Sequence, residues 1–360
     1  MKAAVLHRPL APLTVEEIEI ADPIDREVLV RTAYCGVCHS DLNRVDRADA
    51  GYGGPAVMGH EASGVVEAVG PNVTEFKPGD HVISCNSSFC GKCAYCLVGR
   101  TNLCTDKPAR APDRPPRLSW NGQPLVQQAG IGGYAEQMLC HENGLVKIDP
   151  DMPLDKAALI SCGVITGMGA VLNRAKVKPA STVAVFGVGG IGMSVVQGSR
   201  IAGAKRIVAI DPNADRLARA ADFGATDTID PTLDDPVQAV RDLTSGGVDY
   251  AFEAVGSGET AAQAFGCLRD GGRTVMLGVA EPGATVTVPA AALRREKVLT
   301  GSSMGSNHFK VDMPNFIELY FQGKLMLDEM ITRTFPLEGI NEAFDVCRRG
   351  EGMRSVIAPG

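Results

Sequence analysis

The chain has 360 residues, of which 45% are hydrophobic, and its 42 acidic and 35 basic side chains give a net charge of −7. This length favours two domains over a single core, and the acidic balance argues against nucleic acid or an anionic membrane surface as a partner. No apolar run approaches the roughly 18 residues of a membrane-spanning helix. The cysteine count of 11 is odd, and the first residues, MKAAVLHRPLAP, contain no apolar signal-peptide core. We therefore expect a cytoplasmic protein with reduced thiols.

Glycine-punctuated strand patterns fill the first half of the chain. Alternating apolar side chains predict strands at 13–20 and 27–34, and a short helical stretch follows at 36–45. The segments 57–70 and 76–85 repeat the pattern of short strands separated by turn residues. This half is therefore predicted to be mostly β, in the form of a small bent barrel.

Four cysteines of the segment 85–104 have the spacing C-x2-C-x2-C-x7-C; they are Cys90, Cys93, Cys96 and Cys104. The two-residue gaps let neighbouring thiolates turn onto one ion, and the longer gap brings back the fourth. Four sulfurs close a zinc coordination sphere completely, so such a site stabilises a lobe without doing chemistry. A disulfide framework and four unrelated buried thiols are the alternatives, and the density of the cluster disfavours both.

Three further potential metal ligands are scattered along the chain: Cys38, His60 with its neighbour Glu61, and Cys162. Two thiolates and one imidazole form the open zinc sphere of a catalyst, which leaves a fourth position for water or substrate. Each ligand also has a structural interpretation. Cys162 lies in the apolar run AALISCGVITG, which is typical of a buried thiol, and His60 can simply satisfy a loop. Spacing alone leaves these interpretations open.

The composition changes at about residue 163, where strand and helix patterns begin to alternate. Strands are predicted at 181–187, 206–211, 248–256 and 273–279, and helices at 191–202 and 215–224. Such alternation predicts a parallel sheet that is covered by helices on both faces.

A glycine-rich loop joins the first of these strands to the first helix. One glycine permits a tight turn, a second lets the backbone approach a pyrophosphate, and a third lets helix and strand pack closely. The loop consists of Gly187, Val188, Gly189, Gly190, Ile191 and Gly192. Its position between strand and helix makes it a more specific dinucleotide-binding signal than the glycines alone.

Asp211 ends the next strand, 19 residues after Gly192. A carboxylate at this position accepts hydrogen bonds from the ribose hydroxyls and repels a 2′-phosphate, so the sequence favours NAD over NADP. Arg216 lies one helical turn further on. It either packs on the adenosine side of the nucleotide or is a solvated helix residue.

Several motifs taken together carry a family resemblance. They are CGVCHSD, GHEASGVVEAVG, KPGDHV, the four-cysteine lobe, SCGVITGMGA, VFGVGGIGMSVVQG and INEAFDVCRRGEGMRS. In this order, from residue 1 to about residue 357, they resemble the zinc-dependent alcohol dehydrogenases of the medium-chain dehydrogenase/reductase superfamily. The resemblance implies a GroES-like, mostly β catalytic domain at 1–163 with the structural-zinc lobe at 85–104. It also implies a Rossmann NAD-binding domain at 164–303 and a return to the catalytic domain at 304–360.

The resemblance also implies roles for the scattered ligands. Cys38, His60 and Cys162 would hold a catalytic zinc, and Glu61 would lie behind it and exchange with water as a ligand. Asp41 would orient His60 from the side away from the metal, as a carboxylate commonly does for a metal-bound imidazole. Two zinc ions per chain and NAD are thus the expected cofactors.

The same resemblance implies the remaining catalytic and cofactor contacts. Ser40 would hydrogen-bond the substrate oxygen and begin a proton relay. Thr166 would lie beside the nicotinamide, and Val279 in the cofactor site. His39 and Arg354 would contact the pyrophosphate, which cations stabilise directly. The expected reaction is reversible oxidation of a primary alcohol to an aldehyde, with hydride transfer to NAD.

Two departures from the family pattern bear on the substrate and the proton path. Many members have a histidine five residues after the first zinc cysteine, where this chain has Asn43, and an amide does not titrate near neutrality. We expect protons to leave through water or His39. Small-alcohol enzymes carry bulky apolar side chains where this chain has Asn86, Gln128 and Ala129. That difference predicts a wider, more polar pocket for larger or aromatic alcohols.

Three alternatives remain for the function. The chain lacks the arginine that glutathione-dependent formaldehyde dehydrogenase uses after the last lobe cysteine, although Lys107 or Arg110 are candidates to replace it. A nicotinoprotein would keep its NAD bound, and a non-catalytic NAD-binding relative would lack turnover altogether. Polyol dehydrogenases usually have glutamate in place of Cys162. The segment 105–131 is typical of dimeric relatives, so a homodimer is expected, with a tetramer as the alternative.

Overall fold

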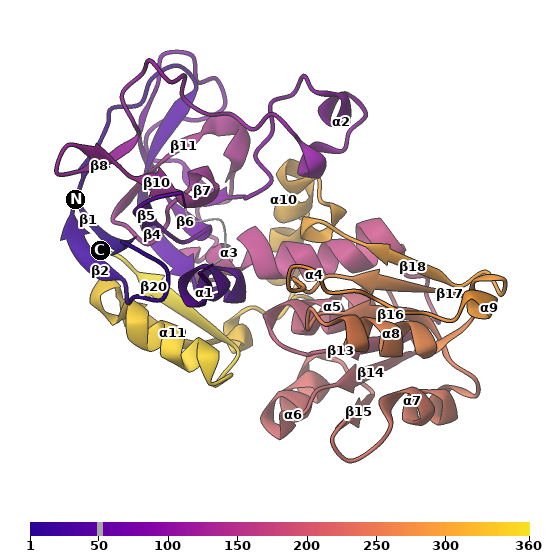
Figure 1. Cartoon of the computed structure of the whole chain (residues 1–360). Helices are drawn as coiled ribbons and strands as arrows, with labels where there is room; N and C mark the ends of the chain where they lie inside the picture. Colours follow the sequence, from indigo (N-terminus) through magenta and orange to yellow (C-terminus); the bar gives the residue numbers. More distant parts are fainter. Residues whose placement is uncertain (49–52) are drawn as a thin grey trace. The chain divides into compact units, whose positions relative to one another are not determined.

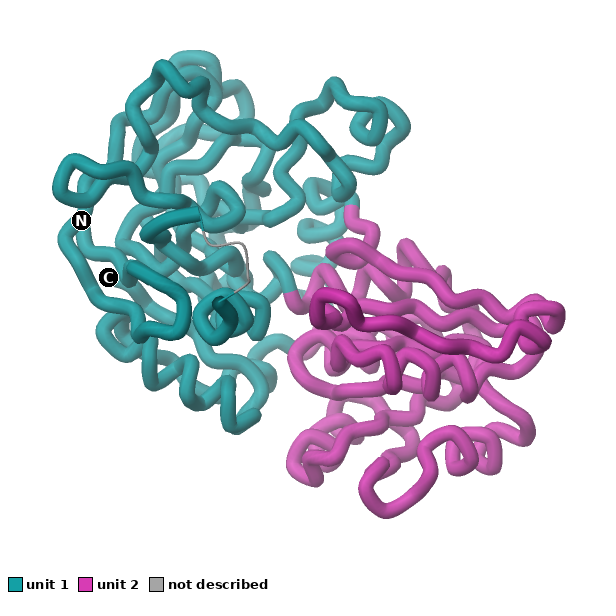
Figure 2. The backbone as a smooth tube through the Cα atoms, in the orientation of Figure 1, with its two compact units in different colours: residues 1–162, 308–322, 327–360 teal, residues 163–307, 323–326 magenta. Residues whose placement is uncertain are grey.

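The computed structural model describes residues 1–48 and 53–360. Figure 1 shows the chain coloured along its sequence, and Figure 2 shows the two compact units into which it packs. The first unit comprises residues 1–162, 308–322 and 327–360, and the second comprises residues 163–307 and 323–326.

The first unit is built on a mostly antiparallel sheet that has one parallel pair of strands at its edge. In sheet order its strands are β12, β7, β6, β4, β20 and β19, and β11 also pairs with β4. Their bounds are Leu145–Lys147 (β12), His81–Ser84 (β7), Glu61–Val69 (β6), Glu27–Gly36 (β4), Arg354–Ala358 (β20), Ile331–Pro336 (β19) and Gln137–His141 (β11). The C-terminal strand β20 thus lies against the end of β4, the strand that leads to Cys38.

Two smaller sheets complete the strands of this unit. One contains β10 (Val126–Gln127), β5 (Ala56–Val57), β1 (Lys2–Leu6) and β2 (Thr14–Glu17), and the other contains β3 (Glu19–Ile20), β8 (Leu118–Trp120) and β9 (Gln123–Pro124). Alternating residues of β4, including Val28 and Val30, are fully buried in a core that also takes Ile340, Ala343 and Phe344 from one helix. The mostly β character that the sequence predicts for this half is confirmed.

Short helices fill the edges of the first unit. They are α1 (His39–Asp46), α2 (Ala94–Leu97), α3 (Leu154–Leu159), α10 (Phe309–Phe321) and α11 (Ile340–Arg348). The buried side chains of α11 recur at three- and four-residue spacing, which places them on one face. That apolar face covers the sheet core.

The second unit contains a six-stranded parallel sheet. Its order is β15 (Asp227–Ile229), β14 (Arg206–Ile210), β13 (Thr182–Phe186), β16 (Val248–Glu253), β17 (Leu268–Met276) and β18 (Val298–Gly301). The helices α5 (Gly190–Ile201), α6 (Ala214–Phe223), α7 (Pro236–Thr244) and α8 (Gly258–Gly266) follow successive strands, and the short α9 (Ala290–Leu293) precedes β18. Chain order reverses between β13 and β16, the point at which such sheets bind nucleotides. The predicted parallel sheet is confirmed.

One helical run was not predicted from the sequence. Residues 154–175 continue from α3 through a π-helical turn, Ile160–Val164, into α4 (Ile165–Gly169) and a second π-helical stretch, Ala170–Ala175. By length and composition alone the run could cross a membrane, so the expectation that no segment approaches such a length was wrong. However, 83% of its most apolar window is buried inside the protein. It therefore has the burial of a core helix, and it carries Cys162 on its first π-helical turn.

Candidate functional site

The four cysteines of the lobe lie close together. Their sulfurs are all within 4.8 Å of one another. The Sγ–Sγ distances are 3.5 Å for Cys93–Cys96 and 3.9 Å for both Cys90–Cys96 and Cys93–Cys104. A tetrahedral zinc with Zn–S bonds of about 2.3 Å has edges of about 3.8 Å. The predicted cluster therefore has the geometry of a closed zinc site.

Backbone donors favour thiolates in this lobe. The N–H groups of Lys92 and Cys93 donate to Cys90 Sγ at 3.4 and 3.3 Å, and they lower the pKa of Cys90. The Cys96 N–H lowers the pKa of Cys93 to about 6, whereas burial raises the pKa of Cys96 to about 12. Since zinc binds deprotonated sulfur, the backbone donors to Cys90 and Cys93 favour the thiolate form that the ion requires.

A second group of ligand atoms is assembled from three distant segments. Cys38, His60, Glu61 and Cys162 each offer an atom within 4.8 Å of the others, and all four residues are buried. Cys38 caps the N-terminus of α1, and His60 directly precedes β6, which begins at Glu61. Cys162 lies on a π-helical turn, a distortion often found at functional sites. The structure thus brings together the three predicted zinc ligands and Glu61.

Gly59 explains how the chain reaches this geometry at His60. Its φ is +90°, which favours glycine, and a Cβ there would lie 2.8 Å from the backbone nitrogen of Tyr134. The Gly59 backbone carbonyl also accepts a hydrogen bond from Gly133 N at 2.8 Å. The residue before His60 must therefore be glycine, because any larger side chain at position 59 would clash with the backbone of Tyr134.

Hydrogen bonds orient the imidazole within the cluster. His60 Nδ1 lies 2.9 Å from Asp41 Oδ1, and Ser40 Oγ lies 3.4 Å from His60 Nε2 and donates to Cys38 Sγ at 3.2 Å. Burial opposes a charged imidazole, but the Asp41 carboxylate raises the pKa of His60 well above its usual value. A hydrogen bond from Cys162 lowers the pKa of Cys38 well below its usual value. The site thus stabilises a thiolate beside an oriented imidazole.

One carboxylate oxygen of Glu61 has no hydrogen-bond partner among the described residues. Its Oε2 accepts a hydrogen bond from the buried Arg354 guanidinium, whereas its Oε1 is buried without a hydrogen-bond partner. A cation in the cluster would satisfy this oxygen. Two sulfurs, one imidazole nitrogen and a spare carboxylate oxygen are a donor set that suits zinc with an open position.

The glycine loop in the second unit has the geometry of a dinucleotide site. Gly187 has a φ of +81°, and a Cβ on Gly192 would lie 1.8 Å from the Gly187 carbonyl oxygen. Gly189 caps the N-terminus of α5, and a Cβ there would meet nothing within 4 Å. Backbone N–H groups at this helix start, with Gly190 and Ile191 in its first turn, are therefore open to an anion.

Asp211 lies directly after β14 and is only 3% exposed. Its carboxylate accepts hydrogen bonds from the N–H groups of Val188 and Asn213, both at 2.9 Å, and Arg216 Nη1 lies 3.8 Å from it. These contacts fix the carboxylate beside the glycine loop, where the sequence predicts ribose binding.

The remaining predicted contacts occupy diverse environments. His39 is exposed, with Nδ1 3.6 Å from Cys347 Sγ, and Val279 is 68% exposed. Thr166 is buried and donates to Met304 Sδ at 3.8 Å. Asn43 is half-buried on α1. Contacts of these four residues with substrate or cofactor stay predictions, as does a contact of Arg354 with pyrophosphate.

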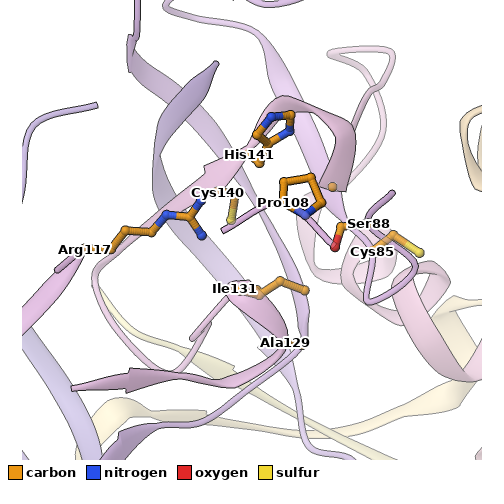
Figure 3. A pocket seen from close by; sticks show the side chains of 10 residues that line it. Cys85, Ser88, Pro108, Arg117, Ala129, Ile131, Cys140 and His141 are labelled. Carbon is orange, nitrogen blue, oxygen red and sulfur yellow. The ribbon is translucent and has the colours of Figure 1, made fainter. Parts of the chain in front are cut away.

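Two of the expected pocket-lining residues have other neighbours in the structure, and their contact with substrate stays a prediction. Gln128 is buried, and its side-chain oxygen accepts a hydrogen bond from Gly59 N at 2.7 Å, so it supports the ligand segment rather than presenting this oxygen to a substrate. Ala129 lines a cavity of about 10 Å³ together with Ile131 and Cys140 (Figure 3). That space is enough for about one water molecule, not for an alcohol.

Tyr134 is a functional candidate that sequence reasoning missed. It is fully buried, and its hydroxyl donates to Asp41 Oδ2 at 2.9 Å. The local sequence GGYAEQ does not indicate that this tyrosine has a buried hydrogen-bond partner, because that partner, Asp41, lies 93 residues away in the chain.

The comparisons with known proteins agree with this geometry. Residues 24–150 match the alcohol dehydrogenase GroES-like domain, and residues 190–322 match the zinc-binding dehydrogenase family. The chain is 39% identical to alcohol dehydrogenase 1 of Oryza sativa subsp. indica, over 99% of this chain and 96% of the relative. It is 40% identical to S-(hydroxymethyl)glutathione dehydrogenase of Escherichia coli, over 99% of both chains. A solved structure of benzyl alcohol dehydrogenase from Acinetobacter calcoaceticus matches with a TM-score of 0.94 and 32% identity, over 100% of this chain and 99% of that one.

A closed cysteine site, an open metal site and a dinucleotide loop on a parallel sheet define a zinc-dependent dehydrogenase. The chain belongs to the zinc-dependent alcohol dehydrogenases of the medium-chain superfamily, and zinc and NAD(H) are its cofactors. The predicted fold class, family and oxidoreductase activity are thereby confirmed.

Proposed function

We propose that the enzyme oxidises bulky or aromatic primary alcohols to aldehydes with NAD, and that free glutathione takes no part. The environment of Arg110 carries the part of this proposal that concerns glutathione. The similarity to a benzyl alcohol dehydrogenase structure supports the aromatic substrate class. Asn86, a polar side chain where small-alcohol enzymes carry bulky apolar ones, supports it as well.

Cys38, His60 and Cys162 hold the catalytic zinc in this proposal. When bound, zinc supplies a Lewis acid that lowers the pKa of the alcohol. Asp41 keeps the imidazole oriented by accepting a hydrogen bond from its Nδ1–H group. The Ser40 hydroxyl, already within hydrogen-bonding distance of Cys38 Sγ, hydrogen-bonds the substrate oxygen and passes its proton on.

The two side chains that were candidates to bind glutathione are both engaged elsewhere. Arg110 is only 9% exposed and donates through Nε and Nη2 to the Glu27 carboxylate, at 2.9 and 2.6 Å. Its remaining N–H groups donate to the carbonyls of Pro115 and Asp22. Lys107 donates to the carbonyl of Asn86. A buried guanidinium committed to a carboxylate cannot leave for a ligand without a large desolvation cost.

A substrate panel with purified enzyme tests the proposal. We expect kcat/KM for benzyl alcohol to exceed that for ethanol by about tenfold or more, because even one methylene group buried in a pocket contributes about 1–3 kcal/mol. Addition of glutathione to formaldehyde should produce no NADH. A higher kcat/KM for ethanol than for benzyl alcohol, or clear glutathione-dependent reduction of NAD, would contradict the proposal. Arg110→Ala should leave the rate of NADH formation from formaldehyde and glutathione the same as in the wild type.

Asp211 supports a preference for NAD over NADP, because its buried carboxylate would repel a 2′-phosphate. Measurement of kcat/KM with NAD and with NADP tests this preference. Asp211→Gly should reduce the ratio of the two values. Exchangeable NAD would also exclude the nicotinoprotein alternative, which predicts NAD retained through purification. Absence of turnover with one zinc per chain would favour the non-catalytic alternative.

We further propose that residues 1–163 and 304–360 form the catalytic domain and residues 164–303 the nucleotide-binding domain of a cytoplasmic homodimer. The two compact units support this division, although the contacts assign residues 163, 304–307 and 323–326 to the second unit. None of the 11 cysteines, all of them in the described residues, is in a disulfide, which supports a reducing compartment. Light scattering in solution distinguishes a dimer from the tetrameric alternative.

A further inference from the structure

We propose that Tyr134 is a positioning residue for the catalytic metal: its hydroxyl fixes the Asp41 carboxylate, which in turn fixes His60. The inference rests on the proposed metal ligands. Tyr134 then forms the third member of a hydrogen-bonded chain in which Asp41 contacts His60 and Tyr134 contacts Asp41.

The first observation is a continuous hydrogen-bonded path. Tyr134 donates to Asp41 Oδ2 at 2.9 Å, and Asp41 Oδ1 lies 2.9 Å from His60 Nδ1. The other ring nitrogen of His60, Nε2, lies 3.4 Å from Ser40 Oγ in the ligand cluster. Each carboxylate oxygen of Asp41 thus has its own donor, and the two donors hold it against rotation.

The second observation is burial. Tyr134, Asp41 and the His60 side chain are 0, 0 and 4% exposed. A buried carboxylate oxygen without a donor carries the full cost of its lost hydration, so removal of the Tyr134 hydroxyl destabilises the ionised Asp41 side chain. Burial and the neighbouring Asp41 charge raise the pKa of Tyr134 well above its usual value, so its hydroxyl keeps the proton that it donates.

The third observation is that the tyrosine is itself held rigidly beside the ligand segment. Its backbone N–H donates to the Met58 carbonyl at 3.0 Å, and Gly133 N donates to the Gly59 carbonyl at 2.8 Å. Its ring packs edge-on against Phe344, with centroids 6.0 Å apart. The residue that precedes His60 therefore lies against Tyr134, and the hydroxyl has a defined place relative to the imidazole.

Tyr134→Phe removes only the hydroxyl and keeps the ring in the core. The full-length, zinc-loaded enzyme is incubated with a chelator, and the release of the two zinc ions is followed as separate phases. We expect the variant to lose the catalytic zinc about tenfold faster, the lower end of the effect of removing a partner of a metal-bound histidine, while the lobe zinc leaves at the wild-type rate. Visible spectra of enzyme with cobalt at the catalytic site should also shift.

Tyr250→Phe is the matched control, because Tyr250 belongs to the parallel sheet and its hydroxyl makes a long contact of 3.5 Å with the Lys176 carbonyl. It should leave both rates and the cobalt spectrum unchanged. Zinc release within twofold of wild type in Tyr134→Phe, with a superimposable cobalt spectrum, would overturn the proposal. Equal acceleration at both zinc sites would also overturn it, since that result indicates general loosening.

A second variant shows whether Tyr134 acts through Asp41. Asp41→Asn should accelerate catalytic-zinc release by itself, and adding Tyr134→Phe should then have little further effect. Multiplicative effects of the two substitutions would mean that the hydroxyl acts by another route. This cycle stays informative if one variant is expressed poorly, because each release rate is measured against the lobe zinc of the same molecule.

Discussion

The two metal clusters of the first unit are built in opposite ways. The four sulfurs of the lobe come from one short segment, 90–104, and three of these cysteines are partly exposed. The second cluster draws Cys38, His60 with Glu61, and Cys162 from three distant segments, and all of its members are buried. The comparison teaches that a closed structural site can be encoded locally, whereas an open catalytic site needs the whole fold to bring its ligands together.

Removal of a ligand from the buried cluster should have the largest effect. Cys162→Ser takes away one thiolate of the open site, and we expect kcat/KM to fall by about 10³-fold or more, because metal stabilisation of charge contributes several kcal/mol. Initial-rate assays and metal analysis check this, with one zinc per chain retained in the lobe.

Cys267→Ser is the control for that change, because Cys267 is an equally buried thiol outside both clusters. It should keep near-normal activity. Wild-type turnover in Cys162→Ser would mean that the open cluster is not catalytic.

Removal of a ligand from the lobe should instead affect stability. Cys96→Ser breaks the closed tetrahedron, so we expect the thermal unfolding midpoint to fall by about 5–10 °C, equivalent to a few kcal/mol in a chain of this size. Activity of the folded enzyme at 25 °C should stay within about threefold of wild type, since this site performs no chemistry. A folded variant with the activity loss of Cys162→Ser would erase the distinction between the clusters.

The segment that follows the lobe is held to the first unit by ion pairs rather than by zinc, because Arg110 and Arg117 both pair with Glu27. Glu27 is 4% exposed and lies between the guanidinium groups of Arg110 and Arg117. Burial opposes its charged form, but hydrogen bonds from Arg110 and Arg117 lower the pKa of Glu27 below its usual value. A carboxyl whose folded-state pKa is lowered stabilises the fold above its unfolded-state pKa and loses that contribution as pH falls through the folded-state value.

Glu27→Gln should therefore reduce the free energy of unfolding by about 3 kcal/mol at pH 7, because it leaves two buried cations without their charge partner. The difference from wild type should shrink once the pH is well below about 4. Denaturant unfolding at several pH values measures it, with both zinc ions retained. If the difference in free energy of unfolding between the two proteins did not depend on pH, the Glu27 ion pairs would not be its cause.

The smallest effect is expected on the helix that carries the first ligands. Asn43 lies on α1, where an imidazole would titrate near neutrality, and we predict that Asn43→His raises turnover at low pH by about threefold. Asn43→Gln, which keeps an amide, is the control. An unchanged profile of kcat against pH would count against a proton path at this position.

Local signals explain what could be predicted from the sequence. The lobe spacing identified four ligands because neighbouring cysteines fold onto one ion. The glycine loop and Asp211 were recognised because each follows a strand of a repeating pattern. Resemblance to a family supplied the link between Cys38, His60 and Cys162, which spacing had left open.

Other features have no local signal. The helical run 154–175 is buried on nearly all sides and contains glycine and β-branched residues, so it shows neither amphipathic period nor strong helix propensity. Gln128 and Tyr134 find their partners, Gly59 and Asp41, 69 and 93 residues away. Such contacts follow from the tertiary fold and leave no pattern along the chain.

Anomalous diffraction from crystals of the wild-type enzyme, measured above and below the zinc absorption edge, tests the central claim most directly. We predict two zinc peaks per chain, one among the four lobe sulfurs and one bonded to Cys38 Sγ, His60 Nε2 and Cys162 Sγ. A zinc-loaded, active enzyme with a peak only in the lobe, or with its second peak away from these three atoms, would contradict the account.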